Sequence, residues 1–192
     1  MPYDKKKHHR RSIRLPDYDY TSPGAYFVTI CVQGGECLLG EVVDGEMRLN
    51  EWGRIAWDCW QVIPEHFPHV ELDAHVVMPN HVHGIIVVTD PVGAQHAAPL
   101  QSAPLQSART NVEPGSLGAI VRSYKSATTK RINRLRDMHS TPFWQRNYWE
   151  HIVRNEESLN RIREYIQNNP ARWAEDQLHP SAPPNPFNKW QP

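Results

Sequence analysis

The chain has 192 residues and a mass of 22.2 kDa, which is enough for one sizeable domain with tails. Its 21 Lys and Arg residues balance 21 Asp and Glu residues, so net charge alone indicates neither a nucleic acid nor a membrane partner. The sequence has no apolar run long enough to span a membrane, and its three cysteines form no CxxC pair. We therefore expect a soluble, reduced, cytoplasmic protein without a disulfide framework or a cysteine zinc site.

The first segments are a basic arm and a strand. Residues 1–16 carry six Lys or Arg side chains, including Arg10 and Arg11, and predict a flexible basic arm. The run 26–33 (YFVTICVQ) is rich in β-branched and aromatic residues and ends at two glycines, which predicts a strand followed by a turn.

A hairpin and an amphipathic helix follow. The run 41–49 has Asp44-Gly45 between two short extended stretches, which is typical of a β-hairpin. From Asn50 onward apolar residues recur with helical spacing, so we expect a helix capped by Asn50 and stopped by Pro64.

Two more strands, at 70–77 and 83–89, precede a change in composition. Pro, Ala, Gln, Ser and Gly dominate residues 90–114, where the sequence APLQS occurs twice in tandem. This composition predicts a flexible insertion rather than a domain boundary, because the remaining half has too few strands to fold alone.

The second half is helical and unevenly charged. Residues 115–136 predict a helix that carries six basic side chains and no acidic one, as a surface that contacts phosphates would require. Its candidate DNA-binding residues, together with Arg10 and Arg11 of the arm, are Arg122, Lys125, Lys130, Arg131 and Arg134. A last helix runs from its cap at Asn155 to Pro170, and residues 174–192 form a Pro-rich tail. The order of elements predicts an α+β domain with an antiparallel sheet.

One candidate site is the triplet His81-Val82-His83. In a strand, side chains at i and i+2 point to the same face, so both imidazoles can reach one divalent metal ion. The alternative interpretation is a pair of ordinary surface or core histidines.

A second candidate site combines Tyr165 and Asn169. They lie about 40° apart on a helix, and Tyr165 falls at the edge of the apolar stripe, where its hydroxyl can face a site. A plain boundary tyrosine and a plain helix-terminal asparagine are the alternative.

Together these residues resemble a known family. The run 78–83 (MPNHVH) followed by an apolar strand resembles the His-hydrophobic-His (HUH) motif of single-tyrosine transposases. The runs 143–155 (FWQRNYWEHIVRN) and 165–170 (YIQNNP) resemble the pattern of REP-associated tyrosine transposases. The resemblance covers roughly residues 20–173.

The resemblance implies a ferredoxin-like domain at 17–173, with a central antiparallel sheet flanked by helices. It implies a metal-dependent enzyme that cuts and rejoins single-stranded DNA at REP-like hairpins through a 5′-phosphotyrosine, as a monomer or homodimer. Tyr165 is the implied nucleophile, with Tyr148 as its rival, and His81, His83 and Asn169 are the implied ligands of Mg²⁺ or Mn²⁺. A phosphodiesterase that uses water and a non-catalytic nucleic-acid-binding module remain as alternatives.

Overall fold

The computed structural model describes residue 15, residues 18–89 and residues 112–183. The predicted arm 1–16, apart from Leu15, lies outside the described residues, and so do Arg10 and Arg11. The same holds for the predicted insertion 90–114 except its last three residues, and for the end of the predicted tail from residue 184.

The expected α+β class is confirmed. Four antiparallel strands form the central sheet in the order β4-β5-β1-β6: β4 (Val70–Val77), β5 (His81–Val88), β1 (Gly24–Cys31) and β6 (Trp149–Val153). A separate hairpin pairs β2 (Gly40–Val43) with β3 (Glu46–Leu49), as the Asp-Gly turn predicts.

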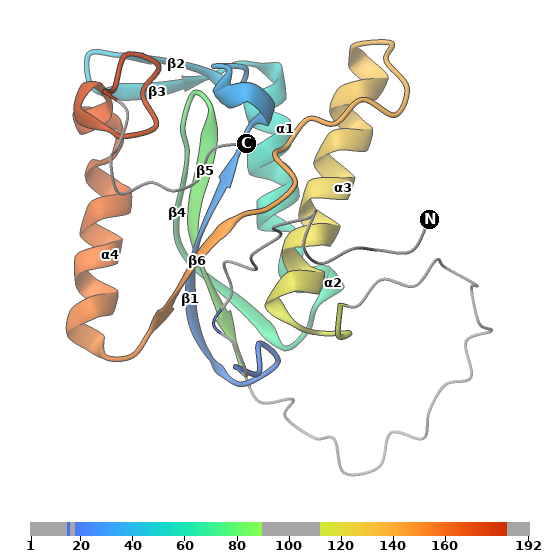
Figure 1. Ribbon diagram of the computed structural model, residues 1–192, viewed down its shortest axis with the longest axis vertical. Coiled ribbons are helices and arrows are strands. Elements are labelled where there is room, and N and C mark those ends of the chain that lie inside the picture. The colour runs from blue at the N-terminus through green and yellow to red at the C-terminus, as the bar shows by residue number, and fades with distance from the viewer. Residues whose placement is uncertain (1–14, 16–17, 90–111, 184–192) are drawn as a thin grey trace, which may run out of the picture.

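Helices cover both faces of the sheet, in agreement with a ferredoxin-like arrangement (Figure 1). On one face lie α1 (Glu51–Gln61), α2 (Ile63–His66) and α3 (Leu117–Leu135), and on the other lies α4 (Glu156–Asn168), which is followed by the 3-10 helix η2 (Pro170–Glu175). The predicted caps are present: Asn50 accepts from the Gly53 amide and Asn155 accepts from the Ser158 amide.

The alternation of side chains along β1 creates two cores of unequal size. Tyr26, Val28 and Ile30 point into a large core against α1 and α3. Phe27 points the other way, into a small core of three buried residues that it forms with Ile85 and Ile166 of α4. The α4 side of the sheet therefore has less buried apolar surface, and polar residues occupy much of it.

Two elements differ from the sequence prediction. Strand β6 was not predicted, because its five residues include a Trp, a Glu and a His and lack a clear alternation of apolar and polar residues. Pro64 does not stop the first helix, which ends at Gln61; it lies in the first turn of the short α2, where proline is tolerated. Within the described ranges, no helix is long and apolar enough to cross a membrane.

Candidate active site

Strand β5 presents His81 and His83 on the face of the sheet that α4 covers. Their rings lie 4.3 Å apart between centroids, and both side chains are buried. The predicted geometry of the HxH triplet, two imidazoles on one face of a strand, is therefore present in the fold.

The neighbouring Asn80 sets the proton position on His81. The Asn80 side-chain nitrogen donates to the carbonyls of Gly35 and Leu178, at 3.0 and 2.7 Å, which leaves its oxygen as the acceptor facing His81. That oxygen lies 2.8 Å from His81 Nδ1, so Nδ1 carries the proton and Nε2 keeps its lone pair. Burial lowers the pKa of His81 to about 3, which keeps the ring neutral.

His83 is held between two hydroxyl groups. Its Nδ1 lies 2.9 Å from Thr29 Oγ1, and its Nε2 lies 3.2 Å from the hydroxyl of Tyr165. Burial and the neighbouring His81 lower the pKa of His83 well below its usual value, so this imidazole is neutral as well.

Helix α4 brings the predicted pair Tyr165 and Asn169 to these histidines. The Tyr165 ring packs edge-on against Phe27, with centroids 6.1 Å apart, yet the residue is 45% exposed. Asn169 caps the C-terminus of α4 and is buried. One helical turn thus places a reachable hydroxyl and a buried amide side by side, as their spacing predicts.

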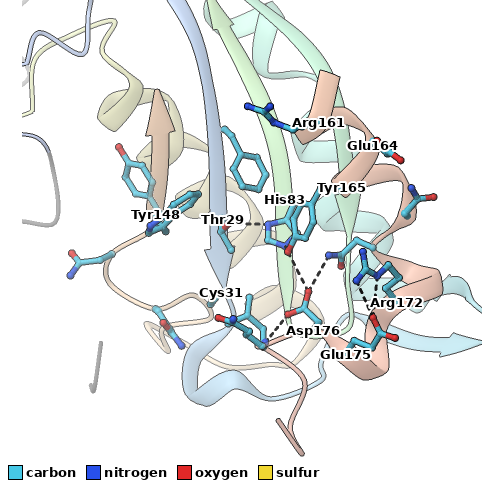
Figure 2. Close-up of a pocket in the computed structure, with 18 residues that line it drawn as sticks. Thr29, Cys31, His83, Tyr148, Arg161, Glu164, Tyr165, Arg172, Glu175 and Asp176 are labelled. Carbon is cyan, nitrogen blue, oxygen red and sulfur yellow. Dashed lines mark hydrogen bonds and ion pairs between the residues drawn. The ribbon is translucent and has the colours of Figure 1, made fainter. Parts of the chain in front are cut away.

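Asp176, which the sequence analysis missed, completes the cluster. It follows η2, within the segment predicted as an irregular tail, and no motif spacing marks it. Its Oδ2 accepts from Asn169 Nδ2 at 3.0 Å and from the Tyr165 hydroxyl at 3.5 Å, while its Oδ1 accepts from the Leu178 amide. Figure 2 shows Thr29, His83, Tyr165 and Asp176 converging on one point.

The cluster has the donor set of a divalent-metal site. Nitrogen or oxygen atoms of His81, His83 and Asp176 all lie within 4.8 Å of one another. His81 Nε2 and Asn169 Oδ1 are buried, and neither has a hydrogen-bond partner among the described residues. Buried polar atoms are otherwise almost always hydrogen-bonded. Two orphaned lone pairs beside a carboxylate therefore fit a metal ion.

The same surroundings affect the tyrosine. Burial of its hydroxyl and, after it, the charge of the Asp176 carboxylate raise the pKa of Tyr165 to about 12. The protein groups alone thus keep this hydroxyl protonated at neutral pH, and a nearby positive charge would favour its deprotonated form.

The cluster residues other than His81 line a pocket of about 960 Å³, in the size range of substrate-binding pockets. Phe27 and Thr29 come from β1, Trp149 from β6, and Arg161 and Tyr165 from α4. Arg161 pairs with Glu157, and Arg172 with Glu175, so the pocket is bordered by both signs of charge.

Comparison with known proteins adds the evolutionary context. No family model matches the chain. Over 177 residues it is 44% identical to an uncharacterized protein of Haemophilus influenzae, and the match covers 92% of this chain and 97% of that protein. The chain belongs to the same family as that protein.

Among solved structures, a REP-associated tyrosine transposase bound to a REP hairpin matches with a TM-score of 0.57 and 17% identity, over 86% of this chain and 77% of that one. The chain has the fold of a REP-associated tyrosine transposase. The resemblance that the sequence motifs carry is thus confirmed at the level of the fold.

Within this fold, the rival tyrosine lines the same pocket without belonging to the histidine–aspartate cluster, and the basic residues of α3 lie away from that cluster. Tyr148 is buried and lies across β1 from Tyr165 (Figure 2). Helix α3 lies on the opposite face of the sheet from α4 (Figure 1), and four of its predicted DNA-binding residues are exposed there. We call them the α3 basic set: Arg122, Lys130, Arg131 and Arg134.

Lys125 differs from that set. Its half-buried ammonium donates to the backbone carbonyls of Gln145, Arg146 and Asn147, the loop that precedes β6. Burial lowers the pKa of Lys125 to about 8. This contact ties α3 to the loop at the edge of the pocket.

Proposed function

We propose that the protein is a metal-dependent transposase that cuts and rejoins single-stranded DNA at REP-like hairpins, using Tyr165 as its nucleophile. The observation that carries this proposal is the position of the Tyr165 hydroxyl. It lies 3.2 Å from His83 Nε2, in the pocket and beside the orphaned His81 Nε2 and Asn169 Oδ1.

In the proposed reaction, the Tyr165 oxygen attacks a phosphorus atom of the DNA backbone. A new P–O bond to Tyr165 forms while the P–O3′ bond breaks, giving a 5′-phosphotyrosine and a free 3′-OH. The phenolic proton passes to solvent, which reaches the half-exposed residue, and the leaving 3′ oxygen takes a proton in turn. Because the number of phosphate ester bonds is conserved, a 3′-OH can reverse the step without ATP.

The residues of the cluster prepare this attack. Phe27 supports the tyrosine ring, and Asp176 Oδ2 accepts from the hydroxyl and orients it. Asn80 holds His81 with its Nε2 lone pair free, and Thr29 holds the His83 ring through Nδ1, which is the usual role of groups behind metal ligands.

The metal would be held by His81, His83, Asn169 and Asp176. Their nitrogen and oxygen donors suit Mg²⁺ or Mn²⁺, and the set extends the ligands that the family resemblance implies by one carboxylate. Bound there, a divalent ion supplies positive charge that lowers the pKa of Tyr165 and neutralises the phosphate oxygens.

The backbone of the DNA needs a basic surface as well. We infer that the α3 basic set contacts phosphates of the hairpin outside the pocket, because these side chains are exposed on one helix that has no acidic residue. The predicted contribution of Arg10 and Arg11 adds to it. Lys125 fits a role in holding the loop before β6.

The test is formation of a covalent adduct. Labelled hairpin DNA with a single-stranded flank is incubated with Mg²⁺ or Mn²⁺, and the protein is run on a denaturing gel. Wild type and Tyr148→Phe should yield labelled protein, and Tyr165→Phe should yield none while it still binds the DNA. Loss of the adduct in Tyr148→Phe alone would reverse the assignment.

Two other outcomes would identify the alternative functions. Cleaved DNA without an adduct at any time would indicate a phosphodiesterase that uses water. Binding that is indifferent to divalent metal, with no cleavage, would indicate a non-catalytic binding module.

A further inference from the structure

Beside the cluster, strand β6 carries an exposed aromatic surface that the proposed chemistry does not use. Trp149 is 50% exposed although it is a large apolar residue, and it lines the same pocket as Tyr165. It lies opposite Thr29 in the register of β1 and β6, so its side chain shares the sheet face that holds His83.

The neighbouring rings fix the orientation of Trp149. Phe27 meets it edge-on, with centroids 5.6 Å apart and ring planes at 75°. His151, two residues along the strand on the same face, has its ring parallel to the indole within 7°, at 6.1 Å between centroids. Phe27 also touches the Tyr165 ring, so a single buried side chain separates the exposed indole from the proposed nucleophile.

We propose that Trp149, assisted by His151, is the platform on which an unpaired base of the DNA stacks next to the scissile phosphate. This inference rests on the proposed function and deepens it. Proteins that bind single strands combine aromatic platforms with cationic side chains, because every base has a π-face whatever its sequence. Arg161 and Arg172 line the same pocket and bring cationic side chains to it, each paired with a glutamate.

The geometry favours an unpaired base over other occupants. Helix α4 forms one side of the pocket of about 960 Å³, and the Tyr165 hydroxyl lies inside it. A ligand that fills the pocket therefore lies beside this hydroxyl. An unpaired nucleotide brings a flat base and a phosphate together, and it matches an indole placed beside a nucleophile. A second copy of the chain paired along the edge strand β6 is the rival occupant.

Affinity for single-stranded flanks tests the platform. In the Tyr165→Phe background, which cannot cleave, fluorescence anisotropy measures the binding of a DNA hairpin with an oligothymidine flank. Trp149→Ala and Trp149→Leu should weaken binding by roughly fivefold to a hundredfold. Trp149→Phe should keep an affinity close to that of the protein with Trp149, because its ring can still stack on a base. The matched control is Trp57→Ala: Trp57 is 38% exposed but lies on α1, so this variant should leave DNA affinity unchanged.

A second probe reports stacking directly. The fluorescence of 2-aminopurine beside the foot of the hairpin should be quenched on binding in the presence of Trp149 and not with Trp149→Leu. Equal affinity of the Leu and Phe variants, or unchanged affinity of all variants, would overturn the proposal. A change in oligomeric state on size-exclusion chromatography without a change in DNA affinity would overturn it in favour of strand pairing.

The adduct assay distinguishes failure of the stacking platform from failure of the proposed transposase function. Trp149 touches no reacting atom, so Trp149→Ala with Tyr165 intact should need a higher DNA concentration for half-maximal adduct formation, in step with its weaker flank binding. An adduct in wild type together with normal flank binding by Trp149→Ala would refute the platform and leave the transposase proposal standing. No adduct in wild type would refute the transposase proposal instead.

Discussion

Gly84 follows His83 in β5, and we expect Gly84→Ala to destabilise the fold. A Cβ at this position would lie 2.2 Å from Trp60 Cζ2, whereas carbon atoms in contact prefer about 3.5 to 4.0 Å. Trp60 has no room to yield, because it is fully buried between the edge-on Tyr124 ring and the stacked ring of His75. Overpacking of this kind costs about 3 kcal/mol, and the lower chain entropy of Ala returns about 0.5–1 kcal/mol.

The expected decrease in free energy of unfolding is therefore about 2 kcal/mol, which urea denaturation should report as a midpoint lower by about 1 M. Trp60→Phe removes the clashing atoms and should itself destabilise by leaving a cavity. The double variant should cost less than the sum of the two, with a coupling above about 1 kcal/mol. Additive costs, or a Gly84→Ala protein as stable as wild type, would show that this contact does not limit the packing of the histidine strand.

Three further predictions concern charge. His81 has a pKa of about 3 in the fold and 6.5 as a free group, so the unfolded chain binds more protons between these values, and this group alone should make metal-free protein less stable by about 2 kcal/mol at pH 5 than above pH 6.5. Urea titrations should find the decrease smaller by about that amount in His81→Gln, where the buried His83 still contributes, and unchanged in a variant of the exposed His139. Asp176→Asn should weaken Mn²⁺ binding measured by calorimetry by roughly tenfold to a hundredfold, while Glu175→Gln should not. Neutralising the α3 basic set should weaken hairpin binding, and the slope of log affinity against log salt concentration should fall by about 0.7–0.9 for each DNA phosphate that the variant no longer neutralises. A changed sequence preference with an unchanged slope would show instead that these side chains contact bases.

The parts of the site that could be predicted are those with a periodic signal. His81 and His83 share a face because a strand has a period of two, and Tyr165 and Asn169 share one because a helix turns every 3.6 residues. Strand β4 has the predicted bounds for a similar reason, since it is a run of suitable residues between clear turns.

Asp176 and β6 could not be predicted because their positions depend on contacts distant in sequence. Asp176 is turned into the site by η2, and its neighbour Leu178 is tied to Asn80, 98 residues earlier, by a hydrogen bond. Strand β6 becomes a strand only by pairing with β1, more than a hundred residues away. The aromatic content of Trp149–His151 was visible, but only the register shows that both rings lie on the sheet face that holds His83.

The two halves of the site are held in place by different forces. The histidine strand β5 lies inside the sheet, paired on both sides and packed on the large core. Helix α4 contributes one fully buried side chain, Ile166, to the small core and depends on polar contacts: Arg163 donates to both oxygens of Asp73 on β4, at 2.6 to 3.2 Å, which lowers the pKa of that carboxyl. Because reacting groups must meet within fractions of an ångström, the alignment of Tyr165 with the histidines depends chiefly on where this ion pair and Asp176 hold α4.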